Sequence, residues 1–218
     1  MGNAWFYGSD GCFVITNFHV AFGQTKKSVR IEPTGKVINR VVLVDNPRSG
    51  HEVRFGYDFN AATGDFVRAA IGTVVAFGIY EEGSIAGMRE DVAVLRLEKC
   101  AGKEFAGLEM DRSEENQKNP LGKLTIVGWM RSEAGGTYIG ARTGCRSTVD
   151  TPGAGLVATS CEIVDGMSGS MLISENTLQI VGLNVSSFSF NDGTKAGISI
   201  SKKFLNRFLD EYFEKARK

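Results

Sequence analysis

The segment Asp165-Gly-Met-Ser-Gly-Ser170 is followed at once by the apolar run Met171-Leu-Ile173. Glycine and serine favour tight turns, and an apolar run directly after such a turn predicts a buried strand. Gly166 and Gly169 can adopt backbone conformations that a side chain would forbid, which lets backbone N–H groups converge on one point. A serine hydroxyl beside converging N–H groups is the local requirement of an oxyanion hole. The segment therefore predicts a nucleophilic Ser168, although the same residue types also occur in ordinary hairpin turns.

Two other stretches supply the partners that such a serine needs. Val14-Ile-Thr-Asn-Phe-His-Val20 ends an apolar run with His19, and Glu90-Asp-Val-Ala-Val-Leu-Arg-Leu97 begins an alternating strand with Asp91. A serine hydrolase uses a nucleophile, a base and an orienting carboxylate, and their order along this chain is His, Asp, Ser. The α/β-hydrolases are excluded, because their order is Ser, Asp, His and they need a glycine where this chain has Ser170.

The three segments resemble the signature segments of the trypsin/chymotrypsin-like serine peptidases. They are Thr16-Asn-Phe-His-Val20, Asp91-Val-Ala-Val-Leu95 and Gly166-Met-Ser-Gly-Ser170. Their form is similar to that of the bacterial members, such as glutamyl endopeptidases and the high-temperature-requirement proteases, and the resemblance covers nearly the whole chain. It implies that His19 is the base, Asp91 its orienting acid and Ser168 the nucleophile.

The resemblance also implies an oxyanion hole formed by the backbone N–H groups of Gly166 and Ser168. Many relatives carry an acid or an asparagine immediately before the serine, where this chain has Met167. Many relatives also need a freed N-terminus that inserts and orders the pocket. Met1-Gly-Asn-Ala4 does not resemble such a terminus, so we expect the pocket to form without that step.

Other residues could take the roles of base and acid. His51 follows the turn-like Pro47-Arg-Ser-Gly50 and is expected to face solvent. The acids near Asp91 that could replace it are Glu81, Glu82 and Glu90. The alternating strand that begins at Asp91 favours it over those acids.

By the resemblance, the substrate pocket lies between the segment before the serine and a strand near residue 185. The residues expected there are Glu162, Ile163, Asn184, Val185 and Ser186. Glu162 lies six residues before Ser168, where trypsin-like enzymes carry an acid that selects basic side chains. Cleavage after Lys or Arg is therefore one hypothesis, and a solvent-facing Glu162 is its alternative. Asn184 falls where glutamate-selective relatives carry a histidine, which argues against an acidic preference.

Composition narrows the partners. Of the 218 residues, 42% are hydrophobic and 23% are charged, as is usual for a soluble globular protein. The formal net charge is zero and no long basic run is present, so nucleic acid is not indicated as a partner. No apolar stretch approaches the roughly 20 residues of a membrane span. The implied partner is a protein or peptide substrate, with no cofactor and no metal; the sequence does not indicate an oligomeric state.

The four cysteines, Cys12, Cys100, Cys145 and Cys161, permit three pairings. Cys145 and Cys161 bracket a short strand-loop-strand segment, which favours a disulfide between them, while Cys12 and Cys100 fit equally well as buried free thiols. The two histidines do not cluster with the cysteines, so a zinc site is not expected. The first residues lack the pattern of a signal peptide, and the expectation is a secreted or periplasmic protein whose leader is absent, with a cytoplasmic protein as the alternative.

Short apolar runs separated by Gly, Asn, Asp and Pro predict an all-β fold with one terminal helix. We expect two six-stranded antiparallel β-barrels of the trypsin-like type. Residues 1–105 form the first barrel with His19 and Asp91, residues 106–122 the connection, residues 123–201 the second barrel with Ser168, and residues 202–218 a C-terminal helix packed on the barrels. Apolar residues recur at helical spacing from Phe204 to Phe213, and Ser201 suits its N-cap.

The expected strands are 12–17, 28–32, 37–44, 52–57, 67–80 in one or two pieces, 92–97, 123–129, 137–148, 156–160, 170–174, 178–186 and 196–200. The barrels would place the site in the crevice between them. The sequence thus favours a serine endopeptidase. The alternatives are a protease fold that acts as a binding module, with weak or no catalysis, and an esterase on the same fold.

Overall fold

The computed structural model describes residues 2–22, 24–31, 36–43, 51–57, 66–78, 85–103, 109–113, 122–131, 137–150, 155–164, 166–189, 193 and 195–215. In the first half the elements are β1 (Trp5–Tyr7), β2 (Phe13–Thr16), α1 (Phe18–Phe22), β3 (Gln24–Ile31), β4 (Lys36–Leu43), β5 (His51–Tyr57), β6 (Phe66–Phe77), α2 (Ile85–Arg89) and β7 (Ala93–Leu97). The second half has β8 (Lys123–Arg131), β9 (Thr137–Asp150), β10 (Leu156–Thr159), β11 (Met171–Ser174), β12 (Ile180–Ser189), β13 (Lys195–Ser201) and α3 (Lys202–Lys215). Mostly β structure with a C-terminal helix confirms the predicted class.

The second half is a closed barrel of six strands in the order β10-β13-β12-β11-β8-β9. All neighbouring strands pair antiparallel. Its buried apolar cluster includes Leu124, Ile126, Leu172 and Val181. Alternating apolar residues on successive strands fill the inside of such a barrel, so this half follows directly from the sequence pattern.

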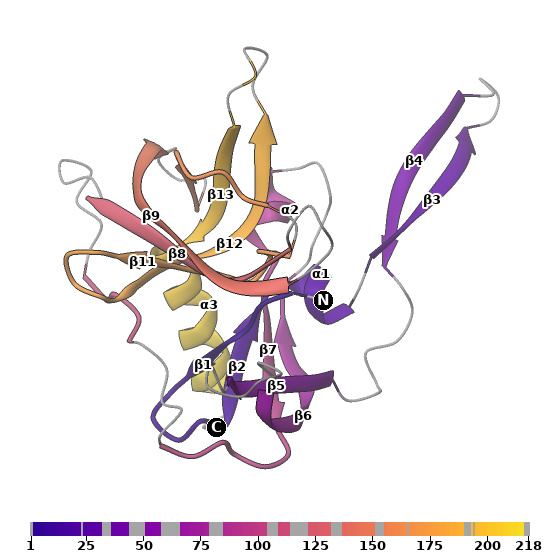
Figure 1. Ribbon diagram of the computed structural model, residues 1–218. Coiled ribbons are helices and arrows are strands. Elements are labelled where there is room, and N and C mark those ends of the chain that lie inside the picture. Colours follow the sequence, from indigo (N-terminus) through magenta and orange to yellow (C-terminus); the bar gives the residue numbers. More distant parts are fainter. Residues whose placement is uncertain are drawn as a thin grey trace.

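The described strands of the first half divide into two sheets. A curled five-stranded sheet has the order β1-β2-β7-β6-β5, and β3 and β4 form a separate two-stranded sheet. Figure 1 shows the β3–β4 hairpin projecting away from the rest of the molecule. The closed six-stranded barrel expected here is therefore a half-barrel, because β3 pairs only with β4 among the described strands.

Helix α3 packs against both halves. Its buried Phe204, Leu205 and Leu209 belong to one apolar cluster with Ile15 of β2 and Ile200 of β13. The Phe204 N–H donates to Ser201 Oγ over 3.4 Å, which confirms the expected N-cap. Burial of each large apolar side chain stabilises the fold by roughly 1.5–3 kcal/mol. The helix thus holds the two halves together beneath the barrel (Figure 1).

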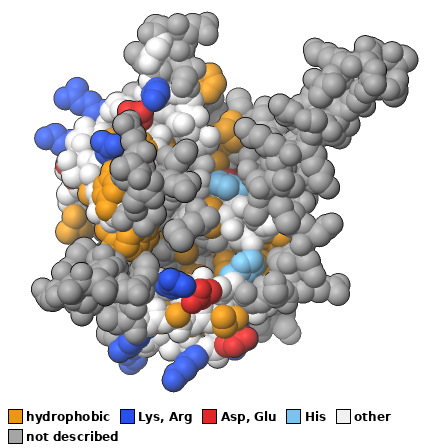
Figure 2. Space-filling view, turned by 45° about the vertical axis from the view of Figure 1, so that its right-hand side comes forward, with side chains coloured by type: hydrophobic (Ala, Val, Ile, Leu, Met, Phe, Trp, Pro, Cys, Tyr) orange, Lys and Arg blue, Asp and Glu red, His pale blue; other side chains and the backbone are white. Residues whose placement is uncertain are grey.

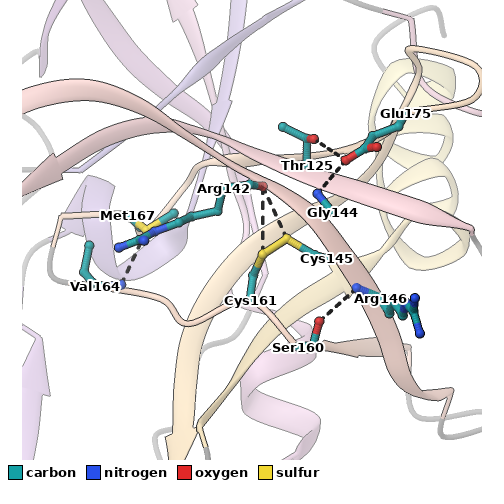
Figure 3. The surroundings of a disulfide bond; sticks show 10 residues. All are labelled: Thr125, Arg142, Gly144, Cys145, Arg146, Ser160, Cys161, Val164, Met167 and Glu175. Atoms are coloured by element: carbon teal, nitrogen blue, oxygen red, sulfur yellow. Dashed lines mark hydrogen bonds between the residues drawn. A yellow bond between two sulfur atoms is a disulfide. The ribbon is translucent and has the colours of Figure 1, made fainter.

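Two disulfides lie one in each half. The Cys145–Cys161 bond confirms the expected pairing and joins β9 to the segment that leads toward Ser168 (Figure 3). Cys12 and Cys100, which fitted equally well as free thiols, also form a disulfide. Cys12 precedes β2 and Cys100 follows β7, and these strands pair antiparallel, so residues far apart in sequence meet at one end of the pair. Local sequence patterns could not predict this disulfide, because its cysteines are 88 residues apart.

No described helix has the length and the apolar character needed to cross a membrane.

Candidate active site

His19 and Asp91 meet at one end of the strand pair β2–β7. Thr16, the last residue of β2, pairs with Ala93, the first residue of β7. Because the strands are antiparallel, the residue just after β2 and the residue just before β7 are brought together. His19 lies in α1, directly after β2, and Asp91 lies two residues before β7.

The Asp91 side chain is fully buried and both of its oxygens are used by His19. Oδ2 lies 2.6 Å from His19 Nδ1, and Oδ1 accepts the His19 backbone N–H over 2.9 Å. Asn17 is also fully buried, and its side chain donates to the Asp91 backbone carbonyl over 2.8 Å. An Nδ1–H directed at the carboxylate leaves the lone pair on Nε2, at the far side of the ring. The imidazole is therefore oriented as a general base requires.

Ser168 lies in a tight turn between the segment from Cys161 and strand β11. Gly166 and Gly169 have φ values of +89° and +80°, in the region that residues with a side chain rarely adopt. A Cβ on Gly169 would lie 2.0 Å from the Asn3 carbonyl oxygen. Met167 is fully buried in the apolar cluster of the barrel, and Asn184 donates to its carbonyl over 3.0 Å. The turn is thus fixed by glycines, by an apolar anchor and by a buried amide.

The turn at Ser168 is tied to the strand that leads to His19. The Asn3 N–H donates to the Ser168 carbonyl over 2.7 Å, and Thr16 Oγ1 donates to the Asn3 carbonyl over 2.5 Å. Gly2 also packs closely here: a Cβ at this position would be 2.5 Å from a Val20 methyl group and 3.1 Å from the Ser168 carbonyl oxygen. His19 and Asp91 are therefore hydrogen-bonded to each other, and Asn3 links the Ser168 turn to Thr16, at the end of the strand that leads to His19.

The N–H groups expected to form an oxyanion hole are available. In the part of the chain that the structure describes, no group accepts a hydrogen bond from the backbone N–H of Gly166 or of Ser168. Gly166 and Ser168 are both half-buried, so their N–H groups are not enclosed in the core. Two unpaired N–H groups on either side of Met167 are what an incoming oxyanion would use.

The sequence left open whether Glu162 lines the substrate pocket or faces solvent. In the structure it lies at the surface. Its carboxylate accepts a 2.6 Å bond from Lys195 Nζ, and that ammonium group lowers the pKa of Glu162. The negative charge that would select a basic substrate side chain is thus already matched by Lys195.

The remaining pocket candidates lie on or near β12 and β13. Ile163 is buried against Gly197, where a Cβ would come within 2.7 Å of its side chain. Asn184 is fully buried, Val185 is buried and Ser186 is half-buried, all on β12. The Asn184 carbonyl accepts the Gly169 N–H over 3.0 Å, so this strand borders the serine turn. Asn184 Oδ1 is buried, and no described residue donates a hydrogen bond to it.

His51 was expected to face solvent, but it does not. It begins β5, pairs with Gly72 of β6 and is half-buried, and burial lowers its pKa. Figure 2 shows both histidine side chains on the same face of the molecule. Of the acids weighed against Asp91, Glu81 and Glu82 lie outside the described residues, and Glu90 forms a 3.5 Å ion pair with Arg89.

Within the described ranges, no group of three or more His, Cys, Asp or Glu side chains could hold a metal ion. Sequence reasoning missed Asn3 and Asn17 as parts of the site. Asn17 lies inside the Thr-Asn-Phe-His segment, so its position was visible but its bond to Asp91 was not. Asn3 carried no local signal, because the partners of its side chain lie more than 120 residues away, at Trp129 and Gly166.

The fold agrees with the comparisons. The chain belongs to the family of trypsin-like peptidase domains, whose model matches residues 2–183. Among solved structures, it is similar to the crystal structure of a thermostable serine protease, AL20, from an extremophilic microorganism. The two share 12% sequence identity with a TM-score of 0.56, over 94% of this chain and 87% of that one. At that identity the likeness concerns the fold. No curated protein matches the chain.

Proposed function

We propose that this protein is a serine endopeptidase that works through an acyl-enzyme intermediate, with His19, Asp91 and Ser168 as its triad. The observation that carries the proposal is the fully buried Asp91 carboxylate, both oxygens of which bind His19. Burying a charge is costly unless the charge is paired and hydrogen-bonded, and His19 supplies both of the bonds to this carboxylate. Family membership and a turn at Ser168 held beside β2 support the same reading.

In the proposed reaction, His19 Nε2 accepts the Ser168 hydroxyl proton as Oγ attacks the carbonyl carbon of the peptide bond. The N–H groups of Gly166 and Ser168 donate to the oxygen that becomes negative. His19 then gives the proton to the leaving amine, and the C–N bond breaks to leave an ester on Ser168. A water molecule then gives a proton to His19 as its oxygen attacks the carbonyl carbon of this ester; the bond from that carbon to Ser168 Oγ breaks, His19 returns the proton to Oγ, and the acid is released.

The first experiment is intact-mass analysis after exposure to a fluorophosphonate probe. We expect one adduct on the unmodified protein and none on Ser168→Ala or His19→Ala. The matched controls are Ser170→Ala, the next serine of the same turn, and His51→Ala, the other histidine; both should label like the unmodified protein. No adduct on a folded protein would instead favour the binding module.

A second assay separates the peptidase from the esterase. An endopeptidase cleaves a denatured protein substrate as well as activated esters, whereas an esterase of the same fold would turn over only the esters. Labelling without any protein cleavage would replace our proposal with the esterase.

Substrate selection is proposed to involve Ile163, Asn184, Val185 and Ser186, with Glu162 selecting Lys or Arg only if a substrate displaces Lys195. A peptide-library profile of the unmodified protein and of Glu162→Gln tests this point. A preference for basic residues that disappears in the variant would assign the selection to Glu162. The same profile in both proteins would remove Glu162 from specificity.

The two disulfides indicate an extracellular or periplasmic protein, because disulfides persist in oxidising compartments. We propose that the protein is secreted or periplasmic. Recovery of all four cysteines as free thiols from the native cell fraction would contradict this.

A further inference from the structure

Asn3 is buried between the two halves, and every polar atom it has is hydrogen-bonded. Its side-chain Nδ2 donates to the carbonyls of Gly166 over 2.6 Å and of Trp129 over 3.1 Å, and lies 3.4 Å from that of Ser168. Its Oδ1 accepts the Trp129 N–H over 2.5 Å. Its backbone N–H and carbonyl bind Ser168 and Thr16. One residue thus joins β2, β8 and the serine turn.

The neighbouring backbone is shaped to admit Asn3. A Cβ on Gly128 would lie 2.8 Å from Asn3 Oδ1, and a Cβ on Gly169 would lie 2.0 Å from the Asn3 carbonyl oxygen. Glycine at these two positions lets the backbone of β8 and of the serine turn approach Asn3 closely. Asn3 is therefore closely packed between the backbone of β8 and the backbone of the serine turn.

The bonds of Asn3 and Asn184 fall on consecutive peptide groups of the serine turn. Asn3 holds the carbonyl of Gly166, Asn184 holds the carbonyl of Met167, and Asn3 again holds the carbonyl of Ser168. In a trans peptide the C=O and the following N–H point in opposite directions, so a fixed carbonyl fixes the next N–H. The Met167 carbonyl therefore sets the direction of the Ser168 N–H, and Asn3 fixes the peptide groups on both sides of it.

We propose that Asn3 is a positioning residue for the oxyanion hole: its carboxamide fixes the serine turn in the conformation that directs the Ser168 N–H toward the substrate. This inference rests on the proposed function. The described hydrogen bonds that hold residues 164–170 are all between uncharged groups. Backbone bonds hold the turn together with the carboxamides of Asn3 and Asn184. The bond from Thr16 to Asn3 also links this turn to β2, the strand that leads to His19.

The test compares Asn3→Ala with Asn206→Ala. Asn206 is a matched control, because its carboxamide also donates to a distant backbone carbonyl, that of Asp111, over 2.8 Å, but on α3 and away from the serine. Both folded variants are assayed for hydrolysis of p-nitrophenyl acetate and for the rate of fluorophosphonate labelling. We expect Asn3→Ala to lower kcat and the labelling rate by about 10- to 100-fold with KM within twofold, because deleting an oxyanion donor outright costs about 100- to 1,000-fold. Asn206→Ala should leave all three unchanged.

Hydrogen exchange of a peptide that covers residues 166–172 gives a readout that needs no activity. We expect faster exchange in Asn3→Ala and unchanged exchange in Asn206→Ala. If Asn3→Ala does not fold, Thr16→Val removes only the hydroxyl that holds the Asn3 carbonyl and should show the same changes at smaller size.

The outcomes separate the two proposals. Unmodified protein that neither labels nor hydrolyses the ester overturns the proposed function, while faster exchange in Asn3→Ala would still support the positioning of the turn. Active unmodified protein with Asn3→Ala equal to it in kcat, labelling and exchange overturns the positioning role and leaves the peptidase intact. A rise in KM alone would also overturn it, since that result would mean that Asn3 affects substrate binding only.

Discussion

The buried Asp91 carboxylate is hydrogen-bonded through both of its oxygens. Its side chain has no exposed surface, and His19 supplies a hydrogen bond to each carboxylate oxygen. An unpaired carboxylate at this depth would cost several kcal/mol. The pair therefore has a defined geometry that a substitution of either partner destroys.

We expect Asp91→Asn to reduce the rate of fluorophosphonate labelling by about 1,000- to 10,000-fold, because an amide cannot accept hydrogen bonds on both of its side-chain atoms and His19 loses its orientation. The protein should remain folded by circular dichroism. Glu90→Gln is the control, since Glu90 is the adjacent acid and lies outside the pair. Equal labelling of Asp91→Asn and the unmodified protein would show that the carboxylate does not orient the base.

Some single residues were visible in the sequence and others were not. His19, Asp91 and Ser168 could be proposed from the sequence because each lies beside an apolar run with a recognisable pattern. The pairing of Glu162 with Lys195 depends on where β13 begins relative to a distant segment, and that distance is not encoded locally. The hydrogen bonds of Asn3 could not be predicted for the same reason, since they form only when β2, β8 and the serine turn are assembled.

At the scale of elements, strands with alternating side chains were predicted well and short elements were not. The predicted strands of the second half correspond to β8 through β13 with small shifts at their ends. The three-residue strand β1 and the five-residue helices α1 and α2 are too short for a periodic pattern to form. The division of the first half into a half-barrel and a hairpin was missed, because strand patterns predict strands and do not determine which strands pair.

The disulfides allow a comparison of two closed loops of different length. The Cys145–Cys161 bond closes a loop with a sequence separation of 16 residues, and the Cys12–Cys100 bond closes one of 88. In the loop-entropy account these lengths correspond to about 3 and about 4.5 kcal/mol of stabilisation. We expect the Cys12→Ala, Cys100→Ala double variant to lose more free energy of unfolding than the Cys145→Ala, Cys161→Ala double variant, measured by guanidinium titration. The reverse order would show that local contacts outweigh loop length.

At the scale of the whole molecule, one buried ion pair joins the segment between the halves to α3. Lys202 Nζ lies 2.7 Å from Asp111 Oδ2 and also donates to Ser113 Oγ over 2.9 Å. The backbone of Asp111 in turn donates to the Ile180 carbonyl of β12 over 2.9 Å. Burial alone would raise the pKa of Asp111, but the hydrogen bonds from Lys202 and Ser113 outweigh this effect and lower the pKa below its usual range.

A carboxyl group with a lowered pKa in the folded state stabilises the protein above its unfolded pKa, and this stabilisation is lost as the pH falls through the folded value. We expect Asp111→Asn to lower the free energy of unfolding by about 3 kcal/mol at pH 7, because Lys202 is left buried without a counter-charge. The difference from the unmodified protein should begin to shrink below pH about 4, where Asp111 of the unfolded chain becomes protonated, and should be smallest once the pH has fallen below the lowered pKa of the folded state.

Urea titrations at several pH values measure this effect. Glu211→Gln is the control, because the Arg207–Glu211 pair on the same helix is exposed at both ends, and such pairs contribute at most about 1 kcal/mol. A difference for Asp111→Asn that stayed constant from pH 7 to pH 3 would mean that the ionised carboxylate is not what stabilises the fold.

Each disulfide closes within one half: Cys12–Cys100 joins residues of the half-barrel, and Cys145–Cys161 joins residues of the closed barrel. Among the described cysteines no covalent cross-link bridges the two halves. The chain could therefore be expressed as two separate polypeptides, divided between residues 113 and 122. Each polypeptide would contain both cysteines of its own disulfide, so the correct pair would form in each. Since His19 and Asp91 belong to one polypeptide and Ser168 to the other, the rate of fluorophosphonate labelling after mixing would report the complementation of the two fragments directly.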